Sequence, residues 1–104
     1  MTLSRKMFAF SCAAGAALAL PSFAHAHGNV RCNSGPAADW KPIEQLKQKI
    51  TGEGWTVRKA HPSKDCYEVY GTTPEGDKVE AFFHPVTLNK VLVLRRGQVL
   101  YKAP

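Results

Sequence analysis

The first 26 residues constrain this chain most, because they carry the pattern of a secretory signal peptide. Arg5 and Lys6 form a basic start before an apolar run over residues 7–20, and the small residues Ala24 and Ala26 mark two possible cleavage sites. The apolar run of about 14 residues is shorter than the roughly 17–25 that a membrane-spanning helix needs. We therefore expect an exported, periplasmic protein that does not span the membrane after cleavage, with 78 of its 104 residues left to fold.

The cysteines predict a covalent crosslink in the remaining chain. A domain of this size buries only about 60% of its unfolded surface, so its stability is marginal without a further constraint. Cys12 lies in the signal peptide, which leaves Cys32 and Cys66 in an oxidising compartment. A bridge between them would close a loop of about 35 residues and stabilise the fold by roughly 3–4 kcal/mol. We predict a Cys32–Cys66 disulfide.

The charge balance indicates an ordinary solvated surface. Without the signal peptide, the chain contains 12 Lys and Arg and 8 Asp and Glu, and the basic and acidic residues are interspersed along it. A basic protein can bind nucleic acid, but an exported one does not meet it. We expect no nucleic-acid partner.

One helix is expected near the start of the folded part. Residues 27–38 are rich in Gly, Asn, Ser and Pro and predict an irregular arm, whereas 39–104 form the domain. Asp39 is placed to cap a helix, and Pro42 is tolerated in its first turn. The apolar residues then fall at helical spacing until glycines end the helix: Ile43, Leu46 and Ile50, followed by Gly52 and Gly54.

After this helix the apolar residues recur with a period of two, which is typical of strands. Strands are expected over 55–58, 66–72, 78–84 and 90–96, with a short segment at 99–101 as a candidate fifth. Residues 61–65 are expected to form a turn and 73–77 a hairpin loop. The order predicts an α+β fold, with the helix packed on a sheet of 3–4 antiparallel strands.

Alternation along the strands assigns two faces to the sheet. The helix should cover the face that carries Trp55, Val57, Tyr67, Val69, Val79, Ala81 and Phe83. The second face should carry Cys66, Glu68, Tyr70, Glu80, Phe82 and His84. Two interpretations of Tyr70 and Phe82 stay open: the disulfide-bound arm shields these rings, or they form an exposed surface for a partner.

Several short motifs, in this order, resemble the PepSY family, and in particular its small stand-alone secreted members. They are Asp39-Trp40-Lys41-Pro42-Ile43-Glu44-Gln45-Leu46, Gly54-Trp55-Thr56-Val57, Tyr67-Glu68-Val69 and Gly76-Asp77-Lys78-Val79-Glu80, within residues 39–95. The resemblance implies a cystatin-like layer of helix on sheet and a non-enzymatic module. PepSY domains occur in protease propeptides, where they are thought to inhibit, and in cell-envelope proteins.

The chain departs from the family pattern before its fourth strand. Where the family has Asp-Pro-x-Thr-Gly, this sequence has His84-Pro85-Val86-Thr87-Leu88-Asn89. The acid is replaced by His84. Because Asn tolerates a positive φ, Asn89 is expected to preserve the turn.

The sequence offers little to catalysis. Its two serines outside the signal peptide, Ser34 and Ser63, lie in loop-like sequence without a motif. His61 and Cys66 could form a nucleophilic pair, but the disulfide is the better use of Cys66. We therefore expect no enzyme.

Metal binding is an alternative at the processed terminus. Cleavage after Ala26 makes His27 the first residue, and cleavage after Ala24 gives His25-Ala26-His27. Either terminus offers an amine and imidazole nitrogens that suit Cu(II) or Ni(II). The chain shows no other expected cofactor.

The main functional expectation is a periplasmic PepSY-like binding module that acts by contact with an envelope protein or a peptidase, as an inhibitor or a regulator. Tyr70 and Phe82 are its candidate partner-binding residues. The alternative is a periplasmic copper- or nickel-binding protein that uses His27 or His25.

Overall fold

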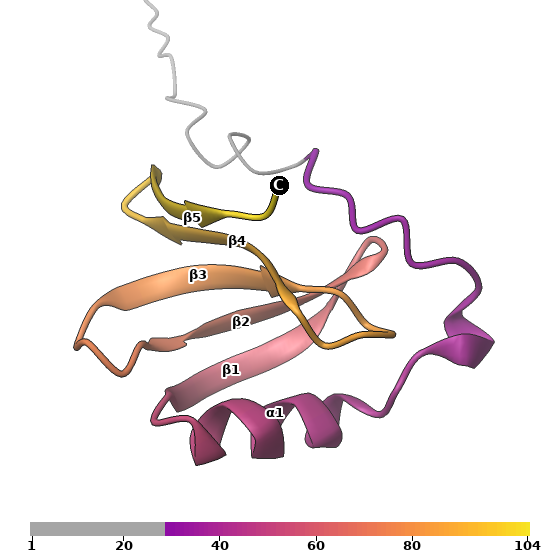
Figure 1. Ribbon diagram of the computed structural model, residues 1–104, viewed down its shortest axis with the longest axis horizontal. Helices are drawn as coiled ribbons and strands as arrows, with labels where there is room; N and C mark the ends of the chain where they lie inside the picture. Colours follow the sequence, from indigo (N-terminus) through magenta and orange to yellow (C-terminus); the bar gives the residue numbers. More distant parts are fainter. Residues whose placement is uncertain (1–28) are drawn as a thin grey trace, which may run out of the picture.

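The computed structural model describes residues 29–104, in which one α-helix is followed by five strands (Figure 1). The predicted signal peptide lies outside the described residues. The elements are η2 (Ala37–Asp39), α1 (Ile43–Gly52), β1 (Thr56–Ser63), β2 (Cys66–Thr72), β3 (Lys78–Phe83), β4 (Lys90–Arg95) and β5 (Gln98–Lys102). The strands form one antiparallel sheet in the order β1-β2-β3-β4-β5, with α1 packed on it. The α+β prediction is confirmed, but the sheet has five strands rather than 3–4.

The fifth strand exists because the chain turns sharply after β4. Arg96 and Gly97 both have positive φ values, 52° and 79°, between the paired residues Arg95 and Gln98. Two consecutive positive φ values are what a two-residue hairpin of right-handed twist requires. Arg is an unusual residue in this conformation, so the sequence predicts a tail more readily than a strand.

The first strand is longer than its sequence suggests. Residues 61–63 were expected in a turn, but β1 continues through Pro62 to Ser63, which pairs with Cys66. Proline is tolerated there because β1 is an outer strand whose N–H groups need no partner on one side. The turn is reduced to Lys64 and Asp65, with Lys64 at φ 57°.

Both outer strands of the sheet contain a bulge. In β1, Val57 pairs with Gly71 and Lys59 with Tyr70, which leaves Arg58 as the extra residue. In β5, Tyr101 pairs with Val93 and Val99 with Leu94, so that Leu100 has no opposite residue. An extra residue bends the strand locally and interrupts its regular pairing.

The helix begins later than predicted. Asp39 lies in η2 and does not cap α1, which starts at Ile43 after Pro42 without a side-chain cap. The segment that leads into the helix is held instead by hydrogen bonds to other parts of the fold. The Tyr67 hydroxyl donates to the Lys41 carbonyl over 2.6 Å, and the Lys41 N–H donates to the Pro85 carbonyl over 3.0 Å.

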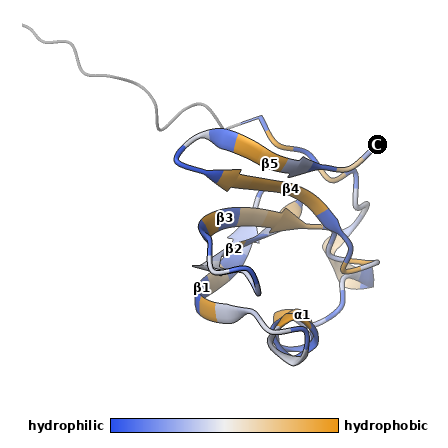
Figure 2. Ribbon diagram, turned by 60° about the vertical axis from the view of Figure 1, so that its left-hand side comes forward, coloured by the Kyte–Doolittle hydropathy of each residue, from blue (hydrophilic) through white to orange (hydrophobic). Residues whose placement is uncertain are grey.

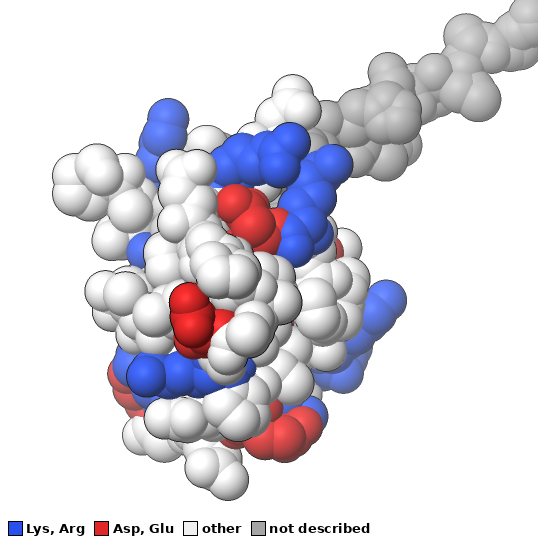
Figure 3. Space-filling model, turned by 90° about the vertical axis from the view of Figure 1, so that its right-hand side faces the viewer, with Lys and Arg blue, Asp and Glu red and all other residues white. Residues whose placement is uncertain are grey.

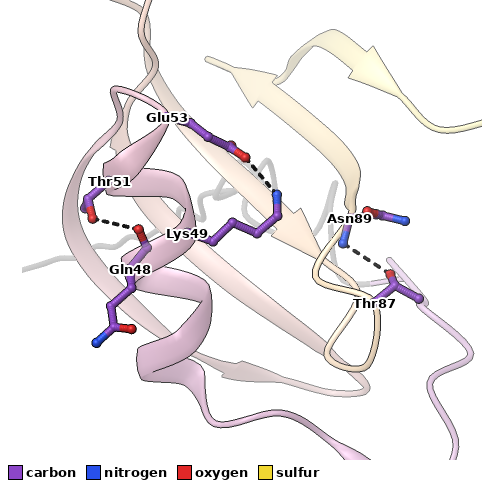
Figure 4. Close-up of polar contacts among 6 residues, drawn as sticks. All are labelled: Gln48, Lys49, Thr51, Glu53, Thr87 and Asn89. Atoms are coloured by element: carbon purple, nitrogen blue, oxygen red, sulfur yellow. Dashed lines mark hydrogen bonds and ion pairs between the residues drawn. The ribbon is translucent and has the colours of Figure 1, made fainter.

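The end of α1 follows the prediction more closely. The helix ends at Gly52, and Gly54 adopts a φ of 104° that suits glycine. In the last turn the Thr51 hydroxyl donates to the Gln48 carbonyl, and the Lys49 ammonium lies 2.9 Å from the Glu53 carboxylate (Figure 4). Both contacts are exposed, so they contribute little to the stability of the domain.

The main core lies between α1 and the sheet. Leu46 and Ile50 are fully buried, as the helical stripe predicts, and the apolar part of α1 is turned toward the sheet in Figure 2. Trp55 packs edge-on against Phe83, with ring centroids 5.7 Å apart. The remaining buried members of this core are Tyr67, Val69, Val79, Ala81, Leu88 and Val93. The predicted helix-facing side of the sheet is thereby confirmed; Val57 is partly buried against it.

His84, which stands where the family pattern has an acid, accepts hydrogen bonds in the β3–β4 turn. Its Nδ1 accepts hydrogen bonds from the N–H groups of Val86 and Thr87, at 3.1 and 3.3 Å. Leu88, and not Asn89 as expected, adopts the positive φ of 65°. Asn89 instead donates its N–H to the Thr87 hydroxyl (Figure 4). The strained Leu88 is 4% exposed, so burial of its side chain in the core offsets the conformational cost.

The N-terminal arm lies against the second face, where it is attached at the β1–β2 turn. The predicted disulfide is present: Cys32 and Cys66 are bonded. Beside it, the Asp65 carboxylate accepts hydrogen bonds from the N–H groups of Cys32 and Asn33, and the Ser34 hydroxyl donates to the Asp65 carbonyl. The bond from Cys32 is the main reason that the pKa of Asp65 is lowered. At the β1–β2 turn, the arm is thus fixed by one covalent bond and three hydrogen bonds.

None of the helices in this described part is long and apolar enough to cross a membrane.

We predict that the core depends on the α1 stripe. Leu46→Ala should destabilise the protein by roughly 2–5 kcal/mol, because it leaves a cavity at a fully buried position. Lys47→Ala changes a neighbouring surface side chain and should cost less than about 1 kcal/mol. Urea unfolding of both variants measures the difference; similar losses would contradict the assigned stripe.

We also predict that reduction loosens the arm. Cys32→Ser/Cys66→Ser should lower the free energy of unfolding by roughly 2–4 kcal/mol, since the bond closes a loop with a sequence separation of 34. Thermal unfolding measures the loss. Addition of a reductant should lower the midpoint of the native protein and leave the double variant unchanged; an unaffected native protein would refute a structural role for the bond.

Candidate functional site

The second face of the sheet is divided into a covered and an open part. Phe82 is 2% exposed and packs with Cys32, Cys66 and Leu94, beneath the arm residue Val30. Of the two interpretations that stayed open for Phe82, the shielded one holds, because the arm covers this ring. The interpretation that the arm shields the second face holds for Phe82 but not for Tyr70, which stays partly exposed.

The Tyr70 ring contacts two side chains of the neighbouring strand β1. The His61 ring stacks on it with centroids 6.2 Å apart and planes 9° from parallel. The Lys59 ammonium lies 5.6 Å from the centre of the Tyr70 ring, within the range of a cation–π contact. These contacts follow from the register of β1 and β2, in which Lys59 pairs with Tyr70 and His61 with Glu68.

Two carboxyl groups meet beside Tyr70. Glu68 is 6% exposed, and its Oε1 lies 3.2 Å from His61 Nε2, without the alignment of a hydrogen bond. Glu80, from β3, receives the Tyr70 hydroxyl over 3.4 Å and also hydrogen-bonds Glu68. Burial and the neighbouring Glu68 both disfavour the charged form of the Glu80 carboxyl.

The pKa values of Glu80 and Tyr70 are both raised. Burial, together with the hydrogen bond and the charge of Glu68, raises the pKa of Glu80 to about 7. Burial is also the first cause that raises the pKa of Tyr70 to about 12, followed by the Glu68 hydrogen bond and charge. Near neutral pH, the Glu80 carboxyl is therefore protonated for part of the time.

Beyond Glu80 the open part of the second face is hollowed. The volume is about 600 Å³, at the end of the sheet where β1 begins and β4 turns into β5. Gly71 allows β1 to come close here, because a side-chain carbon at Gly71 would collide with the Thr56 carbonyl. The polar side chains of the lining are Thr56, Arg58, Thr72, Lys78, Glu80 and Arg96.

The sequence also raised a Cys66–His61 pair, against which the disulfide was preferred, and a metal site at the processed terminus. Cys66 is held in the disulfide and cannot act as a nucleophile with His61. Within residues 29–104 no group of three or more His, Cys, Asp or Glu side chains could hold a metal ion. His25 and His27 lie outside the described residues, so copper or nickel binding there stays a prediction.

The sequence pointed to Tyr70 but missed two features around it. Alternation placed Glu68, Tyr70 and Glu80 on one face, yet only the observed register brings the two carboxyl groups together. The lining of the hollow also includes Arg58, the extra residue at the bulge that shifts the pairing between β1 and β2. The signal that could have indicated it is Gly71, a glycine inside a strand pattern.

The raised pKa of Glu80 predicts a pH-dependent stability. The folded state holds this proton more tightly than the unfolded state, whose pKa is near 4.5. The stabilisation is therefore fully present below about pH 4.5 and is lost as the pH rises through about 7. Glu80→Gln mimics the protonated form, so it should unfold at a higher temperature than the native protein at pH 8, with a difference that shrinks toward pH 4.5. Glu75→Gln, in an exposed loop, is the control; the same behaviour in both variants would contradict this assignment.

The family of the chain follows from a comparison with known domains. A family model described as the peptidase propeptide and YPEB domain, PepSY, matches residues 8–92. No curated protein and no solved structure matches significantly. The matched range contains α1, β1, β2 and β3, and thus both the arm attachment and Tyr70. The chain belongs to the PepSY family, as its motifs suggested.

Proposed function

We propose that this protein is an exported, periplasmic binding module that acts without catalysis, by contact with an envelope protein or a peptidase. The family description supports this, since it links the domain to peptidase propeptides. Inhibition of a peptidase, or regulation in the envelope, is the form of activity that a propeptide-like module suggests.

The observation that carries the proposal is the open part of the second face around Tyr70. A partly exposed tyrosine in contact with His61 and Lys59 presents an aromatic ring in polar surroundings. Tyrosine and similar residues dominate the energy of protein interfaces, because they bury a large area with little loss of conformational freedom. Phe82 contributes to this surface only indirectly, because it supports the sheet from beneath the arm.

The partner should depend on Tyr70. Tyr70→Ala should fold normally, because the ring lies outside both buried clusters, and should lose most of a specific partner in capture from an envelope fraction. Tyr101→Ala is a matched control, since Tyr101 is also exposed but lies on β5. Mass spectrometry identifies the captured proteins, and the activity of any captured peptidase with and without the purified protein tests inhibition.

The outcomes separate clearly. Equal capture by Tyr70→Ala and the native protein would refute this surface. Phe82→Ala should instead lower stability by roughly 3–5 kcal/mol, as a buried aromatic residue does. A Phe82→Ala protein of native stability would show that the arm does not cover the second face.

A further inference from the structure

Three basic side chains gather around the hollow. Arg58, Lys78 and Arg96 come from β1, from β3 and from the β4–β5 turn, and all three are exposed. None of them forms an ion pair with a residue in 29–104, whereas Lys47, Lys49 and Arg95 each pair with a carboxylate. The hollow therefore has a rim of three exposed basic side chains that form no ion pair within residues 29–104.

The acids near this rim do not neutralise it. Among residues 29–104, Glu80 is the only acidic residue that lines the hollow, and it contacts Tyr70 and Glu68. The acids of the adjacent β2–β3 loop, Glu75 and Asp77, line a different depression, with Trp55 and Tyr101, and Asp77 pairs with Arg95 over 2.7 Å. Figure 3 looks onto the opposite end of the molecule, where basic and acidic side chains lie next to each other.

We propose that the hollow binds an extended acidic segment of a protein partner, whose carboxylates pair with Arg58, Lys78 and Arg96. This inference rests on the proposed function and adds the chemistry of the partner. An exposed positive rim attracts a negative segment and disfavours a positive one, so it supplies specificity as well as a faster encounter. Tyr70, on the same face, then serves as the neighbouring aromatic anchor.

The proposal carries a characteristic pH dependence through Glu80. The charged and titratable groups on this face around Glu80 are Arg58, Lys59 and His61 of β1, Glu68 and Tyr70 of β2, Lys78 of β3, and Arg96 after β4. Below about pH 7 the Glu80 carboxyl is mostly protonated and leaves the rim positive. Above that pH it is charged and repels the carboxylates of the segment, so that binding weakens.

The test uses a fluorescein-labelled ten-residue peptide of alternating Glu and Thr, with blocked ends, and a second peptide with Lys in place of Glu. Fluorescence anisotropy with the purified protein at pH 6 and low ionic strength should detect binding of the Glu peptide only. Added salt should weaken this binding, as expected for exposed charge pairs. Absence of Glu-peptide binding, or equal binding of both peptides, would overturn the proposal.

Two variants of equal net charge locate the site. Lys78→Glu/Arg96→Glu should weaken binding of the Glu peptide by about tenfold or more. Lys64→Glu/Lys102→Glu changes two exposed lysines outside the hollow lining and should alter it by less than about twofold, because screening limits distant charges. Equal losses of Glu-peptide binding in both variants would show that the peptide is attracted to the protein's overall positive charge, and would contradict a site at the hollow.

Binding measured at two pH values tests the role of Glu80 directly. Raising the pH from 6 to 8 should weaken binding to the native protein several-fold but should leave Glu80→Gln nearly unchanged. An equal pH dependence in both would overturn the role of Glu80. Tyr70-dependent capture of a partner that persists while the peptide fails would refute the hollow alone, whereas loss of the capture as well would refute the proposed function.

Discussion

The attachment of the arm to the β1–β2 turn is the constraint on which the second face depends. A single α-helix can cover only one face of a five-stranded sheet, and α1 buries the side that carries Tyr67, Val69 and Phe83. The other side carries Phe82 and Leu94, which would meet water without a second cover. The disulfide and the Asp65 hydrogen bonds bring the arm across them. An irregular segment thus covers part of the second face, as a second helix could. Because it does not extend over Tyr70, that ring stays partly exposed.

The spacing of apolar residues predicted the buried side of α1 and the two faces of β2 and β3. The spacing of Leu46 and Ile50 fixed the buried side of α1, and alternation assigned the faces of β2 and β3 correctly. The failures occurred where tertiary context overrode a local preference. Pro62 lies in a strand only because that strand is at the edge of the sheet, and Leu88 accepts a positive φ because its side chain is buried. Neither condition can be read from neighbouring residues.

The candidate site could be predicted only in part, for a similar reason. Alternation correctly grouped Tyr70, Phe82 and the two glutamates on one face. It could not indicate which of the two rings the arm would cover, because that depends on where the chain runs after the disulfide. The proximity of Glu68 and Glu80 likewise arises from the pairing of β2 with β3. A carboxyl cluster of this kind is a property of strand register and not of either residue alone.

The bulges in β1 and β5 also affect how this domain meets other copies of itself. An outer strand exposes unpaired backbone groups that can template a further strand, and β5 carries exposed Val99, Leu100 and Tyr101. Each edge is interrupted, at Arg58 in β1 and at Leu100 in β5, and Pro62 removes a further donor from β1. A straight neighbouring strand would find matching partners over only a few residues. Irregular edges thereby protect a small, apolar sheet from growing into an aggregate.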